Sequence, residues 1–279
     1  MIGRRIASPR ASGIRSPYIP EFRIRIDRRR HLIDPMNDRT DHGQPVKPPA
    51  EAGEASRKAG KFITFEGGEG TGKSTQAATL ARRLEAMGIG VLLTREPGGS
   101  PGAEIIRHVL LSGAAKPFGA EAEAMLFAAA REDHIKCAIK PALEAGKWVV
   151  CDRFADSTRV YQGAVGAVDP RLIKALERVS VGELKPDLTL ILDVPVKLGL
   201  KRAAGRRRGS APDRFEAEQL DFHEKLRRAY LALAEAEPQR CVIVDAGVQK
   251  KEVAAHVWKV VNARFDPAMT PMFYENLAT

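Results

Sequence analysis

The amino-acid sequence predicts an α/β fold, a three-layer doubly wound sandwich built on a five-stranded parallel sheet. From Lys61 onward, short apolar segments alternate with longer segments whose apolar residues recur at helical spacing. This alternation is typical of parallel sheets that are covered by helices on both faces. A glycine-rich loop joins the first predicted strand to the first predicted helix, at the edge of the sheet where such folds bind their ligands.

The predicted strands are short runs of apolar and β-branched residues, and the first contains Phe62-Ile63-Thr64-Phe65. In chain order they are 61–66, 90–94, 148–151, 188–193 and 241–244. Apolar residues at helical spacing mark the helices, as at Ala77, Leu80, Ala81 and Leu84. The helices are predicted at about 73–87, 101–112, 121–145, 156–165, 170–181, 196–204, 214–236 and 248–264. Because parallel strands end at one edge, we expect the functional residues directly after the first four strands.

The two ends of the chain differ from this pattern. Residues 1–60 are rich in Arg, Pro and Ser and show no sustained periodicity, so we predict a disordered extension. An Arg-rich transit peptide is a second interpretation, and an upstream start-site artefact, with Met36 as the true start, is a third. Disorder or artefact is favoured because no cleavage signature stands out. Residues 266–279 are predicted to be a loose tail, which leaves 61–265 as the folded domain.

The composition favours a soluble globular protein with anionic ligands. The chain is 44% hydrophobic and 29% charged, and it has no apolar run long enough to span a bilayer. Residues 1–60 contain 13 Lys and Arg against 7 Asp and Glu, a net +6, which leaves +4 of the total +10 for the remainder. This modest balance suits phosphorylated substrates, and we expect neither nucleic acid nor a membrane as partner. Three scattered cysteines without a metal or redox pattern predict a reducing compartment, the cytoplasm.

The loop after the first strand has the pattern G-x-x-x-x-G-K-[ST], between a strand and a helix as that pattern requires. Its glycines let successive N–H groups point into one concavity, and the helix N-terminus adds partial positive charge. Lys73 would reach the terminal phosphates of a nucleoside triphosphate, and the Ser74 hydroxyl would hold Mg²⁺. The predicted triphosphate-binding residues are Gly67, Gly68, Glu69, Gly70, Thr71, Gly72, Lys73, Ser74 and Thr75.

The next two strands also end in polar residues. Arg95, followed by Glu96-Pro97-Gly98-Gly99, could hold a second phosphate in a bidentate fork, or it could be a solvated residue of a turn. Asp152 occupies the acidic position that steers Mg²⁺, directly or through water, in enzymes with such a loop. Its alternative role is to cap the next turn. Arg153 would lie between the two phosphate sites.

A cluster of arginines lies between two predicted helices. Glycines flank the triple arginine Arg206-Arg207-Arg208, and Arg202 precedes it by one helical turn. A charge run is usually a solvated face. Here the upstream phosphate loop indicates a mobile lid, at about 202–214, that closes its cations over a triphosphate and excludes water.

These separated motifs, taken in order, resemble those of the thymidylate kinase family of P-loop nucleoside monophosphate kinases. The resemblance runs from about Lys61 to Arg264 and is much more specific than the phosphate loop alone. Its motifs are Phe65-Glu66-Gly67, Thr94-Arg95-Glu96-Pro97-Gly98-Gly99, Phe127 with Arg131, Asp152-Arg153-Phe154-Ala155-Asp156-Ser157, Tyr161-Gln162-Gly163, Pro186-Asp187-Leu188-Thr189-Leu190, Leu192-Asp193-Val194 and Asp213-Arg214-Phe215-Glu216.

The resemblance implies roles for the matching residues. Arg95 and Arg153 would hold the acceptor monophosphate, and Glu69 would face the deoxyribose 3′-hydroxyl. The remaining acceptor-binding residues would lie around the base and the sugar: Phe127 stacked on thymine, Arg131 at the edge of the ring, Ser157, Thr158 and Gln162 beside it, and Tyr161 where a ribose 2′-hydroxyl would project. Judged from the residues alone, Phe127 is better explained as a core aromatic of an amphipathic helix.

The chain departs from some relatives in two places. Gly70 and Thr71 stand where these relatives have an arginine inside the loop, so the cation that neutralises the transferred phosphoryl group would come from the lid arginines Arg202 and Arg206 to Arg208. Ala130 stands where some relatives have an acid beside the arginine, which puts a secondary base contact in doubt.

The resemblance implies Mg²⁺-dependent transfer of the γ-phosphoryl group of ATP to dTMP, a step of dTTP synthesis, by a homodimer. Catalysis would come from positioning and charge neutralisation. One alternative is a deoxynucleoside kinase, which needs a general base where this chain has arginines. A second alternative is a non-catalytic nucleotide-binding protein that depends on residues 1–60 and shows no turnover.

Overall fold

The computed structural model describes residues 60–207 and 214–266, all within one compact unit of the chain, Gly53–Thr279. Nearly all of the predicted extension (1–60), most of the predicted tail (266–279) and part of the predicted lid, including Arg208, lie outside the described residues. Within the described ranges no helix has the length and apolarity that crossing a membrane requires.

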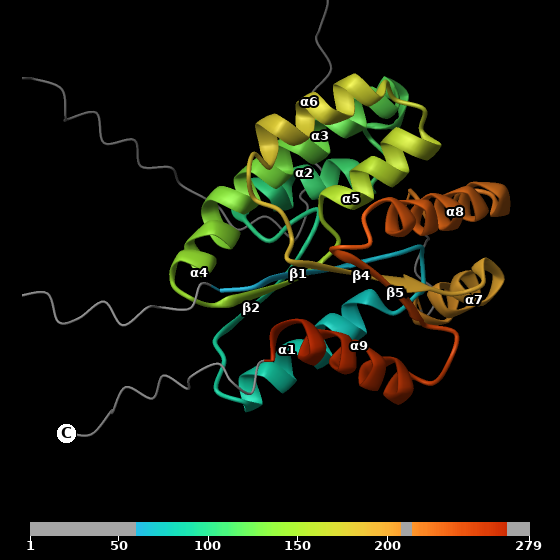
Figure 1. The fold of residues 1–279 in the computed structure, drawn as a ribbon. Helices are drawn as coiled ribbons and strands as arrows, with labels where there is room; N and C mark the ends of the chain where they lie inside the picture. Colours follow the sequence, from blue (N-terminus) through green and yellow to red (C-terminus); the bar gives the residue numbers. More distant parts are fainter. Residues whose placement is uncertain (1–59, 208–213, 267–279) are drawn as a thin grey trace, which may run out of the picture. The chain divides into compact units, whose positions relative to one another are not determined.

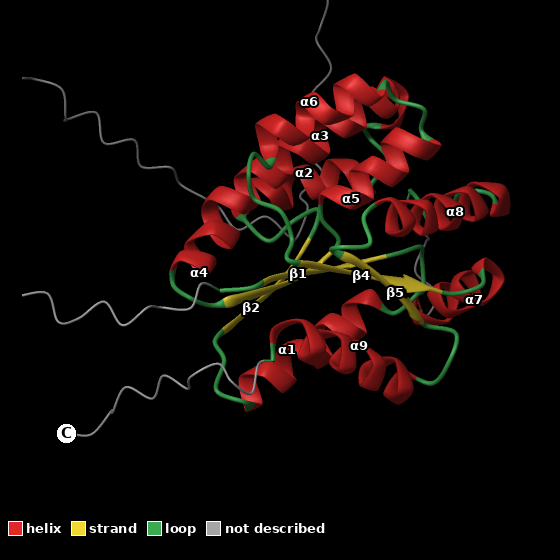
Figure 2. Ribbon diagram, viewed as in Figure 1, coloured by secondary structure: helices red, strands yellow, loops and turns green. Residues whose placement is uncertain are grey.

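Five parallel strands form the centre of the fold, as the sequence predicts (Figure 2). They are β1 (Phe62–Glu66), β2 (Val91–Arg95), β3 (Trp148–Asp152), β4 (Leu188–Asp193) and β5 (Cys241–Asp245). Their order across the sheet is β2-β3-β1-β4-β5, and every neighbouring pair is parallel. The first strand therefore lies in the middle, and Phe65 pairs in register with both Asp152 and Leu190. This register brings the ends of β1, β3 and β4 together at one edge.

Helices cover both faces of the sheet (Figure 1). On one face lie α1 (Lys73–Ala86) and α9 (Lys250–Phe265), which pack against each other. The other face carries α2 (Pro101–Leu111), α3 (Gly119–His134), α4 (Lys140–Glu144), α5 (Ala155–Thr158), α6 (Pro170–Ser180) and α8 (Leu220–Ala236). Helix α7 (Val196–Arg207) follows β4 and packs against α8. The predicted three-layer arrangement is confirmed.

The core is divided between these faces by the alternation of side chains along the strands. Ile63 and Phe65 of β1 belong to the cluster formed with α1 and α9, whereas Phe62 packs with Val149 and Phe154 on the opposite face. Successive residues of a strand point to opposite faces, so a strand in the middle of the sheet is apolar on both. All five residues of β1 are buried, and its two polar residues are hydrogen-bonded, Thr64 to Thr189 and Glu66 to the turn after β3.

The predicted helix boundaries are wrong in three places. The helix predicted at 121–145 consists of α3, a π-helical turn (Ile135–Ile139) and α4, and the one at 156–165 consists of α5 and a π-helical turn (Arg159–Val165). These π-helical turns are short and continue directly from an α-helix, so they interrupt the α-helical spacing too briefly to be recognised in the sequence. Residues 214–219, predicted to begin a helix, form turns before α8, because Phe215 is buried against the aromatic ring of Tyr161 rather than on a helix face.

Candidate active site

The phosphate loop connects the central strand β1 to α1 and is held in its shape by glycines. Gly67, Gly70 and Gly72 have φ values of 132°, 68° and 96°, which residues with side chains rarely adopt. A Cβ atom on Gly70 would lie 1.9 Å from the carbonyl oxygen of Gly199, so α7 lies directly against the loop. No side chain caps the N-terminus of α1, so its first N–H groups are available to an anion.

Lys73 and Ser74, the first residues of α1, face the end of β3. The Nζ atom of Lys73 donates to the carbonyl oxygens of Gly67 (3.1 Å) and Gly68 (2.7 Å). Burial, together with the nearby charge of Arg153, lowers the pKa of Lys73 to about 8. The Ser74 hydroxyl donates to the Oδ2 atom of Asp152. The structure thus brings together the two residues that the sequence predicts as magnesium ligands.

A cleft of about 320 Å³ opens beside the loop at the carboxyl edge of the sheet. A volume of this size is typical of small-molecule sites. Most of the predicted site residues line it: Glu69, Gly70, Gly72, Lys73, Ser74, Arg95, Phe127, Arg131, Asp152, Arg153, Ser157, Thr158, Tyr161, Gln162 and Arg206. Residues without an assigned role in the sequence also line it: Glu96, Pro97, Arg107, Leu111, Phe154 and Phe215.

At the centre of the cleft, Glu69 of the loop is paired with Arg153. The Nη2 atom of Arg153 lies 2.6 Å from Glu69 Oε1, and the Tyr161 hydroxyl donates to the same oxygen at 2.8 Å. Burial alone would raise the pKa of Glu69, but the charges of Arg153 and Lys73 outweigh it and lower the pKa to about 2. Glu69 is therefore a carboxylate that accepts hydrogen bonds at all physiological pH values.

Arg153 has an unusual backbone conformation, with φ of 70°. This left-handed conformation directs the chain from β3 into the turn before α5 and is costly for a residue with a side chain. The Nη1 atom of Arg153 also donates to Gly67 O (3.2 Å), Ser157 Oγ (3.3 Å) and Tyr230 Oη (3.4 Å). The guanidinium group is thus fixed between the phosphate loop and α8.

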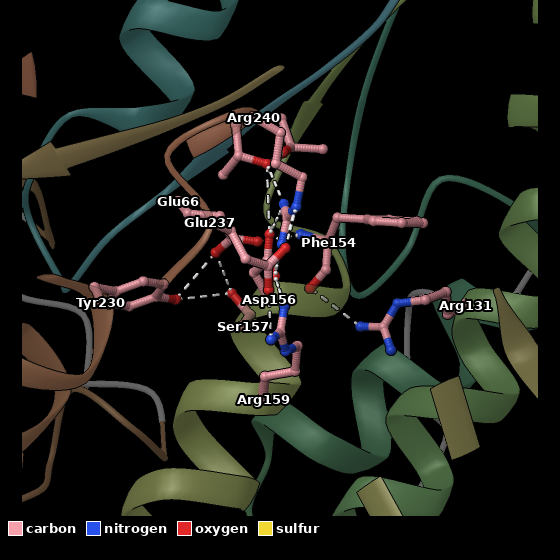
Figure 3. A network of polar contacts seen from close by, with 11 residues as sticks. Glu66, Arg131, Phe154, Asp156, Ser157, Arg159, Tyr230, Glu237 and Arg240 are labelled. Carbon is pink, nitrogen blue, oxygen red and sulfur yellow. Dashed lines mark hydrogen bonds and ion pairs between the residues drawn. The ribbon is translucent and has the colours of Figure 1, made fainter. Parts of the chain in front are cut away.

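Glu66, the last residue of β1, holds the turn that carries Arg153 (Figure 3). Its Oε1 atom accepts from the Phe154 N–H at 2.7 Å, and its Oε2 atom accepts from Ser157 Oγ (2.7 Å) and Tyr230 Oη (3.0 Å). Burial, and after it the negative charge of Asp156, raises the pKa of Glu66 to about 7. Asp156 itself is paired with Arg159 and with Arg240.

This raised pKa predicts a dependence of stability on pH. The pKa of Glu66 rises from its ordinary value of 4.5 to about 7 in the fold. The contribution of its protonated form to the free energy of unfolding is therefore complete below about pH 4.5 and is lost as the pH rises through 7. Between about pH 5 and pH 8 the free energy of unfolding should fall in both proteins. We expect the fall to be about 1–3 kcal/mol smaller in Glu66→Gln than in the wild type. Urea denaturation at the two pH values measures this difference. Equal losses in both proteins would contradict it.

The far end of the cleft is aromatic on one side and cationic on the other. The Phe127 ring lies 6.2 Å from the Phe215 ring, and Phe127 packs at the margin of the cluster formed by α8. Arg131 is buried on α3, with its guanidinium carbon 5.4 Å from the centre of the Phe154 ring. Phe127 is therefore both a core aromatic and a lining residue of the cleft.

Arg95 lies at the mouth of the cleft and is the most exposed of the predicted phosphate ligands. Its Nη2 atom pairs with Glu104 of α2 at 2.9 Å, and the same carboxylate accepts from the Gly99 N–H at 2.9 Å. The side chains of Arg95 and Glu104 are 51% and 44% exposed. An ion pair as exposed as this contributes little to stability, so Arg95 can be redirected to another anion at low cost.

The predicted lid arginines do not gather at one place in the described part of the chain. Arg206 lines the cleft and pairs with Glu216 at 2.9 Å. Arg202 is directed elsewhere, since its Nη1 atom donates to the carbonyl oxygen of Ala246 (2.6 Å) in the turn after β5. The backbone of Arg207 ends α7, but its side chain, like the whole of Arg208, lies outside the described residues.

Several polar residues of the site were missed as functional residues. Glu66 is the last residue of β1 and Glu96 directly follows β2, and a carboxylate at the end of a strand was the available signal. Tyr230 of α8 reaches Arg153, and His134 of α3 reaches Glu96. Nothing local marks these two residues, because their partners are far away along the chain.

Comparison with known proteins agrees with this geometry. The family model described as "Thymidylate kinase" matches residues 65–257. A thymidylate kinase of Nitrobacter winogradskyi is 62% identical over 210 residues, which cover 75% of this chain and 91% of the relative. One of Bradyrhizobium diazoefficiens is 61% identical over 208 residues, covering 75% and 91%.

A solved structure is similar as well. The crystal structure of thymidylate kinase from Ehrlichia chaffeensis matches with a TM-score of 0.58 and 34% identity, over 73% of this chain and 99% of that one. The match therefore extends over nearly the whole of a thymidylate kinase, with the phosphate loop and the cleft included. The chain belongs to the thymidylate kinase family of nucleoside monophosphate kinases.

Proposed function

We propose that the cleft is the acceptor site of a reaction in which the γ-phosphoryl group of ATP is transferred to dTMP, giving dTDP and ADP. The observation that carries this proposal is the junction at Arg153. Its guanidinium group contacts the phosphate loop at Gly67 O and at Glu69, and it also lines the cleft. A donor in the loop and an acceptor in the cleft would therefore meet at one cation, as in-line phosphoryl transfer requires.

In this proposal the two ends of the cleft bind different parts of dTMP. Arg95 and Arg153 hold the monophosphate, as arginine forks do for phosphate oxygens. Phe127 stacks on the thymine ring, and Arg131 donates to an oxygen at its edge. Ser157, Thr158 and Gln162 lie beside the base, Glu69 accepts from the 3′-hydroxyl, and Tyr161 occupies the space that a 2′-hydroxyl would need. All of these residues line the cleft.

The donor side consists of the loop Gly67–Thr75, which would bind ATP through its N–H groups, with Lys73 on the terminal phosphates. Magnesium would be held by Ser74 and Asp152. A hydroxyl and a carboxylate in contact suit this hard cation, which commonly takes only one or two protein ligands and completes its shell with phosphate oxygens and water. Bound there, Mg²⁺ would neutralise charge on the phosphates.

Catalysis would depend on positioning and on cations rather than on a base, because the acceptor phosphate is already a nucleophile. Among the lid arginines, Arg206 supports a catalytic role most directly, since it lines the cleft with a side chain that is 63% exposed and pairs with Glu216. Arg202 would contribute from α7, once released from the carbonyl oxygen of Ala246, and Arg207 and Arg208 are candidates for the same role. Closure of this segment would exclude water from the phosphoryl group.

We also propose that the protein is a homodimer in the cytoplasm. Helices α2 and α3, which pack against each other, expose Ile105 (71%) and Met125 (50%). Apolar side chains gathered on neighbouring helices favour a protein interface. The three free cysteines suit a reducing compartment.

The dimer is tested by an interface mutation. We expect Ile105→Asp to shift the protein from dimer to monomer in analytical ultracentrifugation, because a buried carboxylate without a partner opposes association. Val248→Asp is the matched control, since Val248 is also exposed but follows β5, away from these helices. A wild type that sediments as a monomer would refute the proposal.

The reaction is tested by a coupled ADP-release assay with Mg²⁺ and ATP. The acceptors to compare are dTMP, dUMP, dCMP, AMP and thymidine. We expect turnover with dTMP to exceed that with AMP and thymidine by about a hundred-fold or more. A preference for thymidine would assign the chain to the nucleoside kinases, and ATP binding without turnover for any acceptor would refute the proposed reaction.

A further inference from the structure

A group of polar side chains lies at the base end of the cleft, and of its members only Arg131 has a role in the reaction proposed above. It consists of Glu96, which follows β2, and of Arg131 and His134 on α3, which are 6%, 3% and 0% exposed. Arg131 Nε donates to Glu96 Oε2 at 2.8 Å, and His134 Nδ1 lies 3.1 Å from Glu96 Oε1. His134 Nε2 lies 2.7 Å from the hydroxyl of Thr94.

The contacts fix the roles of the hydrogen-bonding atoms. A carboxylate only accepts, so His134 Nδ1 carries a proton and donates to Glu96. The hydrogen bond between His134 Nε2 and the hydroxyl of Thr94 holds the other side of the ring. Each oxygen of Glu96 is thereby matched to one donor, and the buried carboxylate is paired with the charge of Arg131. Unpaired, either of these charges would be costly at this depth.

The same contacts determine which part of Arg131 is left for a ligand. Of the five N–H donors of an arginine, Nε is taken by Glu96, and Nη2 donates to Phe154 O (3.2 Å) and Thr158 Oγ1 (3.0 Å). Figure 3 shows the contact with Phe154. Within the described part of the chain Nη1 has no protein partner, although Arg131 lines the cleft. The guanidinium group therefore offers the cleft donors and no acceptor.

We propose that Glu96, supported by His134, is a positioning residue that fixes Arg131 so that Nη1 meets an acceptor atom on the base. A pyrimidine with an oxygen at ring position 4 supplies this acceptor, whereas a 4-amino pyrimidine presents two donors and is rejected. Glu96 would thus set the discrimination between dTMP and dCMP, although Arg131 makes the contact. This inference rests on the proposed placement of the base at Arg131.

The test is Glu96→Gln, assayed with dTMP, dCMP and ATP. The amide has one oxygen that accepts and no charge, so Arg131 loses the negative charge that holds it. We expect the KM for dTMP to rise about ten-fold or more, the effect of losing a charge-assisted hydrogen bond, with the KM for ATP unchanged. The ratio of kcat/KM for dTMP over dCMP should fall by about the same factor, because dCMP makes no such bond to lose.

Asp133→Asn is the matched control for loop stability. Asp133 holds the same loop to α3 through Ser100 Oγ (2.6 Å) and Ala103 N (3.0 Å), but the structure gives it no contact with Arg131. We expect a lower Tm with the dTMP/dCMP ratio unchanged. A ratio lowered equally in Asp133→Asn would show that Glu96 acts only through general stability, and the inference would fail.

A double-mutant cycle with Arg131→Met separates positioning from other effects. If Glu96 acts through Arg131, Glu96→Gln should change the dTMP/dCMP ratio in the wild type and leave it unchanged in Arg131→Met. Equal effects in both backgrounds would overturn the inference. If Glu96→Gln does not fold, His134→Gln can be used instead, because it changes the hydrogen bond that holds the other oxygen of Glu96. It should also lower the dTMP/dCMP ratio. A wild type inactive with dTMP would instead refute the proposed reaction itself.

Discussion

Replacing Lys73 with alanine is expected to lower kcat by about a thousand-fold or more, the largest single effect in this protein. Lys73 is buried at the start of α1, and its ammonium group lies against the loop carbonyls that surround the phosphate site. Its positive charge would stabilise the negative charge that shifts between the phosphates during transfer. Steady-state kinetics with saturating ATP and dTMP measure the loss. Lys259→Ala, which removes an exposed lysine of α9, should be fully active.

The pKa of Lys73 adds a prediction about pH. Because burial and the charge of Arg153 lower this pKa to about 8, Lys73 is protonated below about pH 8 and loses its charge above it. We expect kcat/KM for ATP, which reports groups of the free enzyme, to fall above about pH 8 by up to ten-fold per pH unit. Lys73→Arg should lose this fall, since arginine stays charged. A fall that persists in Lys73→Arg would assign it to another group.

The second large effect is expected at Arg153. Arg153→Lys keeps the positive charge but not the fork, which spans Glu69 through Nη2 and Gly67 and Ser157 through Nη1. We expect kcat/KM for dTMP to fall about a hundred-fold or more, since both the acceptor phosphate and the loop lose a fixed cation. Arg171→Lys is the control, because Arg171 is 91% exposed and pairs only with Asp169 nearby.

Thermal unfolding checks that Arg153→Lys acts on the reaction. The partner Glu69 keeps a cation in this variant, so we expect a modest drop in Tm beside the large loss of activity. Arg153→Met leaves the buried carboxylate of Glu69 unpaired and should lower Tm further. If kcat/KM falls equally in Arg153→Lys and Arg171→Lys, Arg153 has no special place in the reaction.

The sheet and the phosphate loop were predictable because their signals are local. An apolar run such as Phe62–Phe65 is short and buried on both faces, and the glycine positions of the loop are set by backbone angles rather than by distant partners. The start of α8 was not predictable in the same way. Phe215 looks like the first apolar residue of a helix face, but its burial comes from Tyr161, fifty-odd positions away.

The site was predictable residue by residue but not as a network. Ends of parallel strands meet at one edge, so Arg95 and Asp152 could be expected together with the phosphate loop, although Glu66 was missed. That Tyr230 donates to Glu66, or that His134 supports Glu96, depends on how α8 and α3 pack on the sheet. No periodicity in the sequence encodes such a contact between side chains.

The pairing of Lys73 with the carbonyls of Gly67 and Gly68 has a consequence for nucleotide affinity. Among the described residues, two of the three N–H donors of Lys73 already bind the loop, so a phosphate finds one free donor and must compete for the other two. At the mouth of the cleft it competes with Glu104 for Arg95. Binding is therefore an exchange of partners, whose net gain is smaller than the number of new contacts suggests. The protein can thus hold many cations around a highly charged substrate and still release its product.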